Sequence, residues 1–199
     1  MHTTTDHDAL ATELLVVRCR LGEPAAYDEL VAAWHPRLWR YARRMTGEDD
    51  AAEEIVQESW LRILRGLPRL RRPSHLGAWI FGIAHRVLAD RLRARYRAAG
   101  RTELDLETLD AGAEASFDEL VQRSSIERAL ERLPLFEREV VLLFYLDEQP
   151  QTEIAASLGV PLGTVKSRLH RARRLLREAL ETLGEEPASA GARNQRSPR

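Results

Sequence analysis

The sequence predicts an all-α protein in which a flexible linker joins two small helical domains. Apolar residues recur at helical spacing through most of the chain, and no segment shows the sustained alternation that is typical of a strand. One internal stretch has few large apolar residues and no sustained period, as in a linker. We therefore expect domains at residues 10–97 and 118–183, a linker at 98–117 and a disordered tail at 184–199.

The first domain contains a helix with an acidic face, predicted over residues 49–64. Its apolar side gathers Ala52, Ile55, Val56, Ser59, Trp60 and Ile63. Its other side gathers Asp50, Glu53, Glu54, Gln57, Glu58 and Leu61. A leucine among carboxylates suits a docking surface for a basic protein, but single leucines are also ordinary on protein surfaces. Periodicity alone leaves both interpretations open.

The next segment is basic, with ten arginines against Asp90 alone over residues 65–101. A loop is predicted first, and then a helix from about Ala78 with two apolar faces, so this helix is expected to pack against two neighbours. Arginines interleaved with aromatic residues can hold single-stranded DNA by neutralising phosphates and stacking on a base. Trp79 fits a core position equally well, and Asp90 fits an ion pair within the helix, with Arg86 or Arg93.

The second domain ends in a predicted helix-turn-helix. Residues 151–158 form the first helix, Gly159 takes the positive φ that ends it, and Pro161 suits the first turn of the next helix. In that second helix an apolar stripe is predicted from Val165, Leu169, Ala172 and Leu176, and a basic face from Lys166, His170, Arg173, Arg174 and Arg177. No acidic residue lies between Pro161 and Arg177. The pattern favours DNA as an anionic partner, with RNA, a membrane surface or plain solvent as alternatives.

Composition excludes several classes of protein. Cys19 is the only cysteine, and the six histidines lack the spacing of metal ligands, so we expect no metal and no cofactor. Paired carboxylates such as Glu53 and Glu54 lie on a solvated face, so we expect neither an enzyme nor a small-molecule substrate. The first residues do not resemble a leader and no apolar run reaches spanning length, which predicts a cytoplasmic protein without membrane insertion.

Three runs in order carry a resemblance to a known family: DDAAEEIVQESWLRIL, AWIFGIAHRVLADRLRAR, and LPLFEREVVLLFYLDEQPQTEIAASLGVPLGTVKSRLHRARRLLREAL. Together they resemble bacterial RNA polymerase sigma factors of the sigma-70 family, in the extracytoplasmic function (ECF) subfamily. The resemblance implies a region 2 helical bundle and a region 4 helix-turn-helix. It also implies a transcription initiation factor whose partners are core RNA polymerase (the β′ clamp helices and the β flap), promoter DNA and an anti-sigma factor.

The resemblance also implies roles for individual residues. Core polymerase binding falls on Asp50, Glu53, Glu54, Gln57, Glu58 and Leu61. Recognition and melting of the −10 element fall on Ser74, His75, Trp79, His85, Arg86, Asp90 and Arg93. Recognition of the −35 element falls on Thr164, Lys166, Ser167, Arg168, His170, Arg171 and Arg173. Under this assignment Ser74 and His75 lie in the loop that cradles a flipped base.

The sequence departs from the family at two places. Arg86 stands where an asparagine is common, and Gln149-Pro150-Gln151 stands where a serine or threonine cap is frequent.

Two other functions account for part of the chain. A two-domain helix-turn-helix regulator that does not dock on core polymerase explains the second domain alone, and a helical adaptor needs no specific DNA binding.

Overall fold

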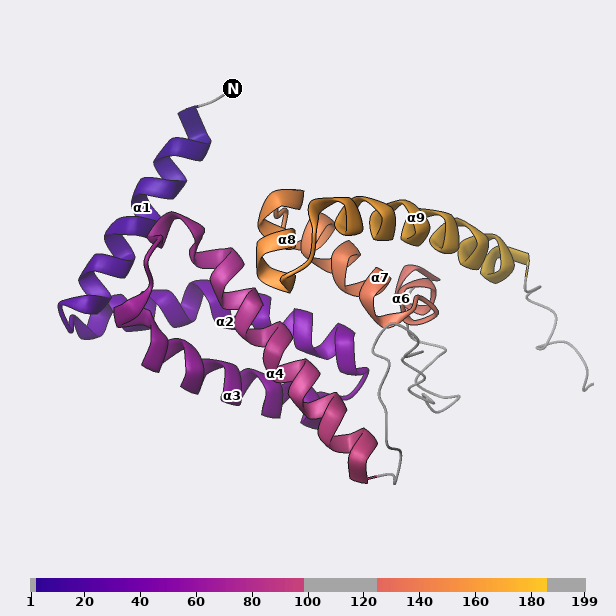
Figure 1. Ribbon diagram of the computed structural model, residues 1–199, viewed down its shortest axis with the longest axis horizontal. Coiled ribbons are helices and arrows are strands. Elements are labelled where there is room, and N and C mark those ends of the chain that lie inside the picture. The colour runs from indigo at the N-terminus through magenta and orange to yellow at the C-terminus, as the bar shows by residue number, and fades with distance from the viewer. Residues whose placement is uncertain (1–2, 99–124, 186–199) are drawn as a thin grey trace, which may run out of the picture.

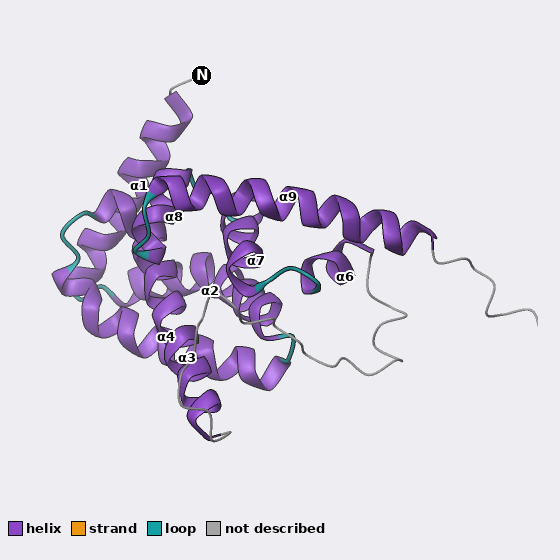
Figure 2. Ribbon diagram, turned by 45° about the vertical axis from the view of Figure 1, so that its right-hand side comes forward, coloured by secondary structure: helices purple, strands orange, loops and turns teal. Residues whose placement is uncertain are grey.

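The structure is a computed structural model that describes residues 3–98 and 125–185. The first part contains α1 (Thr3–Arg20), α2 (Pro24–Thr46), α3 (Asp49–Gly66), two 3₁₀ turns (Leu67–Arg69 and Pro73–His75) and α4 (Leu76–Ala98). The second contains α6 (Ser125–Glu131), α7 (Leu135–Val141), a π-helical turn (Leu142–Leu146), α8 (Gln151–Leu158) and α9 (Leu162–Glu185). These described parts hold no strand, which agrees with the predicted all-α class (Figure 2).

An antiparallel hairpin of α2 and α3 forms the base of the first bundle (Figure 1). Gly47 ends α2 with φ of 77°, a left-handed conformation that costs glycine little, and its N–H donates to the Arg43 carbonyl. The predicted inward face of α3 is confirmed, since Ala52, Ile55, Val56, Ser59 and Ile63 are buried and Trp60 is partly buried.

Helix α4 begins at Leu76, two residues before the predicted start, and packs on α3 along one side and α8 along another. This confirms that its two apolar faces meet two neighbours. Phe81 and Ile80 are fully buried, and the Phe81 ring meets Tyr41 of α2 edge-on at 5.5 Å between centroids. Helix α4 therefore contacts both halves of the chain.

The helix-turn-helix has the predicted turn. Gly159 ends α8 with φ of 67°, and its N–H donates to the Ala155 carbonyl. Helix α9 starts at Leu162, so Pro161 precedes the first turn instead of lying in it, and the Pro161 carbonyl accepts the N–H of Thr164 at 2.9 Å. The predicted stripe faces inward, because Val165, Leu169 and Ala172 are buried and Leu176 is partly buried.

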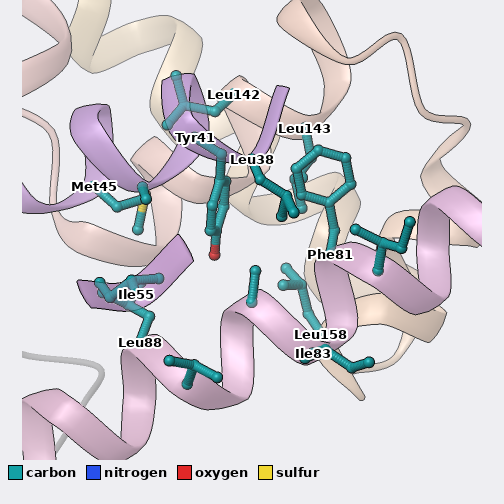
Figure 3. Packing of buried hydrophobic residues seen from close by; sticks show 14 of the residues in the cluster. Leu38, Tyr41, Met45, Ile55, Phe81, Ile83, Leu88, Leu142, Leu143 and Leu158 are labelled. Carbon is teal, nitrogen blue, oxygen red and sulfur yellow. The ribbon is translucent and has the colours of Figure 1, made fainter. Parts of the chain in front are cut away.

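The two halves share one continuous apolar core. Leu142, Leu143 and Leu158 of the second half lie among Leu38, Tyr41 and Phe81 of the first half (Figure 3). The predicted linker beyond Ala98 and the predicted tail beyond Glu185 lie outside the described residues. Close packing of the halves against each other was not predicted from the sequence.

Candidate nucleic-acid interface

The acidic face of α3 is open to solvent. Asp50, Glu53, Glu54 and Gln57 are exposed, Glu58 is partly buried, and the Leu61 side chain is 49% exposed. Three contacts order this face: Gln57 donates to Glu53 at 3.0 Å, Arg62 donates to Glu58 at 2.7 Å, and Arg91 of α4 pairs with Glu54. The result is an anionic surface with an exposed leucine at its C-terminal end, which suits a basic protein partner.

A basic hollow of about 460 Å³ lies where the loop meets α4. Its lining includes three of the predicted −10 residues, His75, Trp79 and Arg86, together with Arg69, Arg71 and Arg72 from the loop. His75 and Arg86 are exposed, as is Ser74 on the second 3₁₀ turn. The hollow combines several positive charges with one indole ring, a combination that can bind phosphate and stack a base.

Trp79 lies between the core and the surface of the hollow. Its indole packs against the apolar core and against Gly66, where a Cβ would lie 2.9 Å from a ring carbon. Part of the same side chain lines the hollow. Because Gly66 has no side chain, the indole ring can approach the end of α3 closely.

Asp90 and Arg93 lie apart from the hollow. Asp90 accepts from Arg93 at 2.9 Å within α4 and from Arg62 of α3 at 3.1 Å. The predicted ion pair within the helix is thus present with Arg93, and a second pair ties α4 to α3. Exposed pairs of this kind contribute only about 0–1 kcal/mol to stability.

His85 turns away from the hollow toward the other half of the chain. Its Nδ1 lies 2.9 Å from Oε1 of Glu139 on α7, and its side chain is 19% exposed. Burial alone would lower the pKa of His85, but the charge of Glu139 and the hydrogen bond to it outweigh burial and raise the pKa above its usual value. In this arrangement His85 belongs to the contact between the halves.

The basic face of α9 points to solvent. Lys166, Ser167, His170, Arg171 and Arg173 are exposed, whereas Thr164 and Arg168 are partly buried. Within the described residues, Lys166 and His170 form no ion pair. In a helix-turn-helix bound to DNA, the N-terminal part of the second helix enters the major groove. The exposed residues listed above lie in that part of α9.

Three arginines of α9 are held by neighbours. Arg171 lies 3.1 Å from the buried carboxylate of Glu137, Arg168 lies over the Phe136 ring at 4.5 Å, and Arg173 donates to the Tyr145 hydroxyl at 2.9 Å. Arg171 and Arg168 also line a hollow of about 250 Å³ beside Ser167 and Thr164. Helix α7 and the π-helical turn thus orient the basic face.

Sequence reasoning missed Glu137 and Glu139. Both are buried on α7, inside the apolar run LFEREVVLLFYL. A charged residue within such a run indicates a buried partner, because an unpaired buried carboxylate is costly. The same reasoning identifies Arg138, which is 2% exposed and donates to backbone carbonyls, among them that of Leu133 at 3.2 Å.

The described part of the chain contains neither a cluster of potential metal ligands nor a helix long and apolar enough to cross a membrane.

Comparison with known proteins identifies the family. The Sigma-70 region 2 family matches residues 30–98, and the Sigma-70 region 4 family matches residues 123–185. The ECF RNA polymerase sigma factor SigL of Mycobacterium tuberculosis is 36% identical over 164 residues, which cover 80% of this chain and 89% of SigL. The chain belongs to the ECF RNA polymerase sigma factors.

Other relatives support the same family. SigE of Mycolicibacterium smegmatis is 34% identical over 178 residues, covering 85% of this chain and 68% of SigE. Among solved structures, CnrH in complex with the cytosolic domain of CnrY has a TM-score of 0.65 at 24% identity, with 86% of this chain and 98% of that chain covered. RpoE of Bartonella quintana, in complex with the anti-sigma factor NepR, has a TM-score of 0.63 at 24% identity, with 78% and 96% covered. These structures share the fold of this sigma factor.

Family membership settles the general function. This sigma factor is a transcription initiation factor that directs RNA polymerase to promoters, and the alternatives of a regulator without polymerase docking and of an adaptor are not favoured. The family is one of non-enzymatic initiation factors.

Proposed function

We propose that this sigma factor binds core polymerase through the acidic face of α3, reads the −10 element with the hollow beside α4 and reads the −35 element with α9. The observation that carries the proposal is the separation of charge. An anionic face lies on α3, and two cationic DNA faces lie on other elements. One partner protein and one nucleic acid can therefore be held at the same time.

For polymerase binding we assign Asp50, Glu53, Glu54, Gln57, Glu58 and Leu61 to the β′ clamp helices. The exposure of Leu61 and the ordered carboxylates around it support this assignment. We assign contact with the β flap to region 4. The domain limits that we propose are 10–97 for region 2 and 118–183 for region 4.

For the −10 element we assign base capture to Ser74, His75 and Trp79, and contact with phosphate or a base edge to Arg86, the residue that replaces the common asparagine. For the −35 element we assign base contacts to Lys166, Ser167, His170 and Arg171. Phosphate contacts fall to Thr164, Arg168 and Arg173. The fixed geometry of Arg171 beside Glu137 supports a directional contact, because a guanidinium held in place matches the edge of a guanine.

We also infer that an anti-sigma factor is a partner of this protein. We infer in addition that it acts in the cytoplasm, where polymerase and template meet, and that the chain itself has no catalytic activity. The neighbour RpoE, solved with the anti-sigma factor NepR, supports the first of these inferences.

The proposal is tested by reconstitution with core polymerase. Run-off transcription from promoters mapped after overexpression is expected to require the sigma factor and to fall when Glu53 is reversed in charge. A protein that binds those promoters without core polymerase and never supports transcription would contradict the proposal.

A further inference from the structure

Helix α7 supplies a carboxylate to the recognition helix α9, against which it packs (Figure 1). Oε1 of Glu137 lies 3.1 Å from Nη1 of Arg171. The two side chains differ in burial, because that of Glu137 is 8% exposed and that of Arg171 is 59% exposed. The carboxylate therefore lies beneath the basic face of α9 and holds a guanidinium that emerges on that face.

This ion pair is a poor source of stability. Removing a carboxylate from water is costly, and a guanidinium that stays mostly in solvent offsets only part of that cost. Glu137 also lies in the first turn of α7, where a negative charge suits the helix dipole, but an exposed carboxylate would suit the dipole as well. The burial of Glu137 beneath Arg171 therefore indicates a role in orienting the guanidinium.

A second arginine of the basic face is held in a different way. Nε of Arg173 donates to the neutral hydroxyl of Tyr145 at 2.9 Å. A hydroxyl fixes the position of Arg173 without offsetting its charge, so the attraction of this arginine for a phosphate is kept. The carboxylate of Glu137 both fixes Arg171 and offsets its charge. The two arginines are therefore suited to different parts of a DNA duplex.

The ion pair leaves hydrogen-bond donors on Arg171. A guanidinium carries five N–H donors in a planar fork, and the pair with Glu137 is formed at Nη1. Two parallel donors match N7 and O6 of guanine in the major groove. Attraction to phosphate depends on charge, which Glu137 reduces, whereas recognition of a base edge depends on the direction of the donors, which Glu137 fixes.

The surroundings of the pair support a contact with DNA. Thr164, Ser167, Arg171 and Glu137 line one hollow of about 250 Å³. The first three belong to the N-terminal part of α9, which is the part of a recognition helix that enters the major groove. Glu137 thus forms a wall of the surface that we assign to the −35 element, although it belongs to another helix.

We infer that Glu137 is a specificity-determining positioning residue of the −35 site: it holds Arg171 and offsets its charge, so that Arg171 reads a guanine edge instead of binding phosphate. The inference rests on the proposed role of α9 in −35 recognition. Loss of the charge of Glu137 should strengthen binding to every sequence and weaken the preference among sequences. A carboxylate with a structural role alone would affect neither the salt dependence of binding nor the base preference.

The test uses holoenzyme reconstituted from core polymerase and the full-length sigma factor. Its dissociation constants are measured on fluorescent promoter duplexes that carry each single-base change in the −35 element, at about 50 to 200 mM salt. Glu137→Gln keeps the shape of the side chain and removes its charge. We expect tighter binding of all duplexes at low salt and a log–log salt slope steeper by about 0.9, the value for one more phosphate contact.

The base preference is read at the position where Arg171→Ala lowers discrimination. There Glu137→Gln should reduce discrimination from about tenfold to about twofold or less. Glu178→Gln is the matched control, because it removes a carboxylate that pairs with Arg174 at 2.9 Å on the same helix. The control should discriminate among bases as the unchanged protein does, and an equal loss in both variants would contradict the inference.

A double-mutant cycle shows whether the effect of Glu137 passes through Arg171. In an Arg171→Ala background, Glu137→Gln should have no further effect on base preference and should steepen the salt slope less than half as much. The same steepening with and without Arg171 would mean that the carboxylate acts on DNA through its general field, which would overturn the inference.

Arg171→Lys provides a second route if thermal unfolding shows that the Glu137 variants are unstable. Lysine keeps the positive charge and can keep the pair with Glu137, but it lacks the planar fork of donors. We expect discrimination to be lost at the same base with no change in the salt slope. Full discrimination by Arg171→Lys would show that a point charge is sufficient, and the proposed reading of a guanine edge would be wrong.

Lys166→Ala separates this inference from the proposed function, because Lys166 is exposed on the same helix. Unaltered binding of every duplex by both Lys166→Ala and Glu137→Gln would mean that α9 does not read the −35 element, which refutes the proposed function and the inference together. Weaker binding by Lys166→Ala, with the salt slope and base preference of Glu137→Gln unaltered, would refute only the inference.

Discussion

His85 on α4 and Glu139 on α7 lie 2.9 Å apart, although 54 residues separate them in sequence. The first was predicted to contact DNA, and the second belongs to the other domain. This contact makes the relation between the two domains sensitive to the charge of one imidazole. The charged groups that act on His85 are those of Glu139, Arg86 and Arg168. The Glu139 carboxylate also accepts a hydrogen bond from the Tyr41 hydroxyl.

The first prediction concerns pH. Because the folded pKa of His85 is raised, its stabilising contribution is fully present below the ordinary histidine pKa of about 6.5 and is lost as pH rises through the raised value. We expect the free energy of unfolding of the unchanged protein to fall over this range relative to that of His85→Gln. Urea unfolding from pH 5.5 to 9 measures the difference, and parallel curves would contradict it.

The second prediction concerns the hydroxyl of Tyr41. Tyr41→Phe leaves the buried Glu139 carboxylate with one bond fewer and should lower the free energy of unfolding by about 1–3 kcal/mol. The desolvated Tyr41 hydroxyl, whose pKa burial and Glu139 raise well above its usual value, stays protonated as a donor. Tyr27→Phe, at a partly buried position, is the control, and equal loss in both variants would argue against the bond.

The third prediction concerns the acidic face of α3. Glu53→Lys should weaken binding to core polymerase by tenfold or more, about 1.4 kcal/mol, and leave binding of a −35 duplex unchanged. Glu53 is the sharper choice, because Glu54 also pairs with Arg91 and its reversal would disturb the bundle. Asp28→Lys, at an exposed site on α2, controls for net charge. If Asp28→Lys weakened polymerase binding equally, the assignment to α3 would fail.

The fourth prediction concerns base recognition by α9. Lys166→Ala and Arg171→Ala should each cost about 1–3 kcal/mol at the base that the residue contacts, if the contact is to a guanine. Arg171→Ala should also lower stability, since it leaves the buried Glu137 without this partner. Binding to a series of −35 duplexes with one base changed measures the effect. A uniform loss across the series would instead indicate contact with phosphate.

The fifth prediction concerns the core beneath that face. Leu169→Ala should lower the free energy of unfolding by about 2–5 kcal/mol, because the side chain is 1% exposed and its removal leaves a cavity. Leu180→Ala, on the same helix with 39% of the side chain exposed, should cost much less. Thermal unfolding of both variants gives the comparison, and similar losses would contradict the described packing of α9.

Local features were predictable because they depend on neighbours within a few residues. The acidic face of α3, the stripe beneath α9 and the positive φ of Gly159 follow from helical spacing and from the freedom of glycine. The ion pair of Asp90 with Arg93 is likewise a contact within one helix turn. The exposure of Lys166 and His170 follows from the same periodicity.

The amino-acid sequence alone determined the all-α class, the acidic and basic faces and the resemblance to ECF sigma factors. Each of these follows from the spacing of residues within a helix or from the order of motifs along the chain. Only the tertiary structure decided that α8 covers α4, that His85 meets Glu139 and that Ser157 bonds Ala78. The physical reason is that the periodicity of apolar residues shows which side of a helix is buried but does not show which other helix packs against that side. Two apolar faces on α4 require two neighbours, and long-range packing, with Gly82 permitting close approach, selects them.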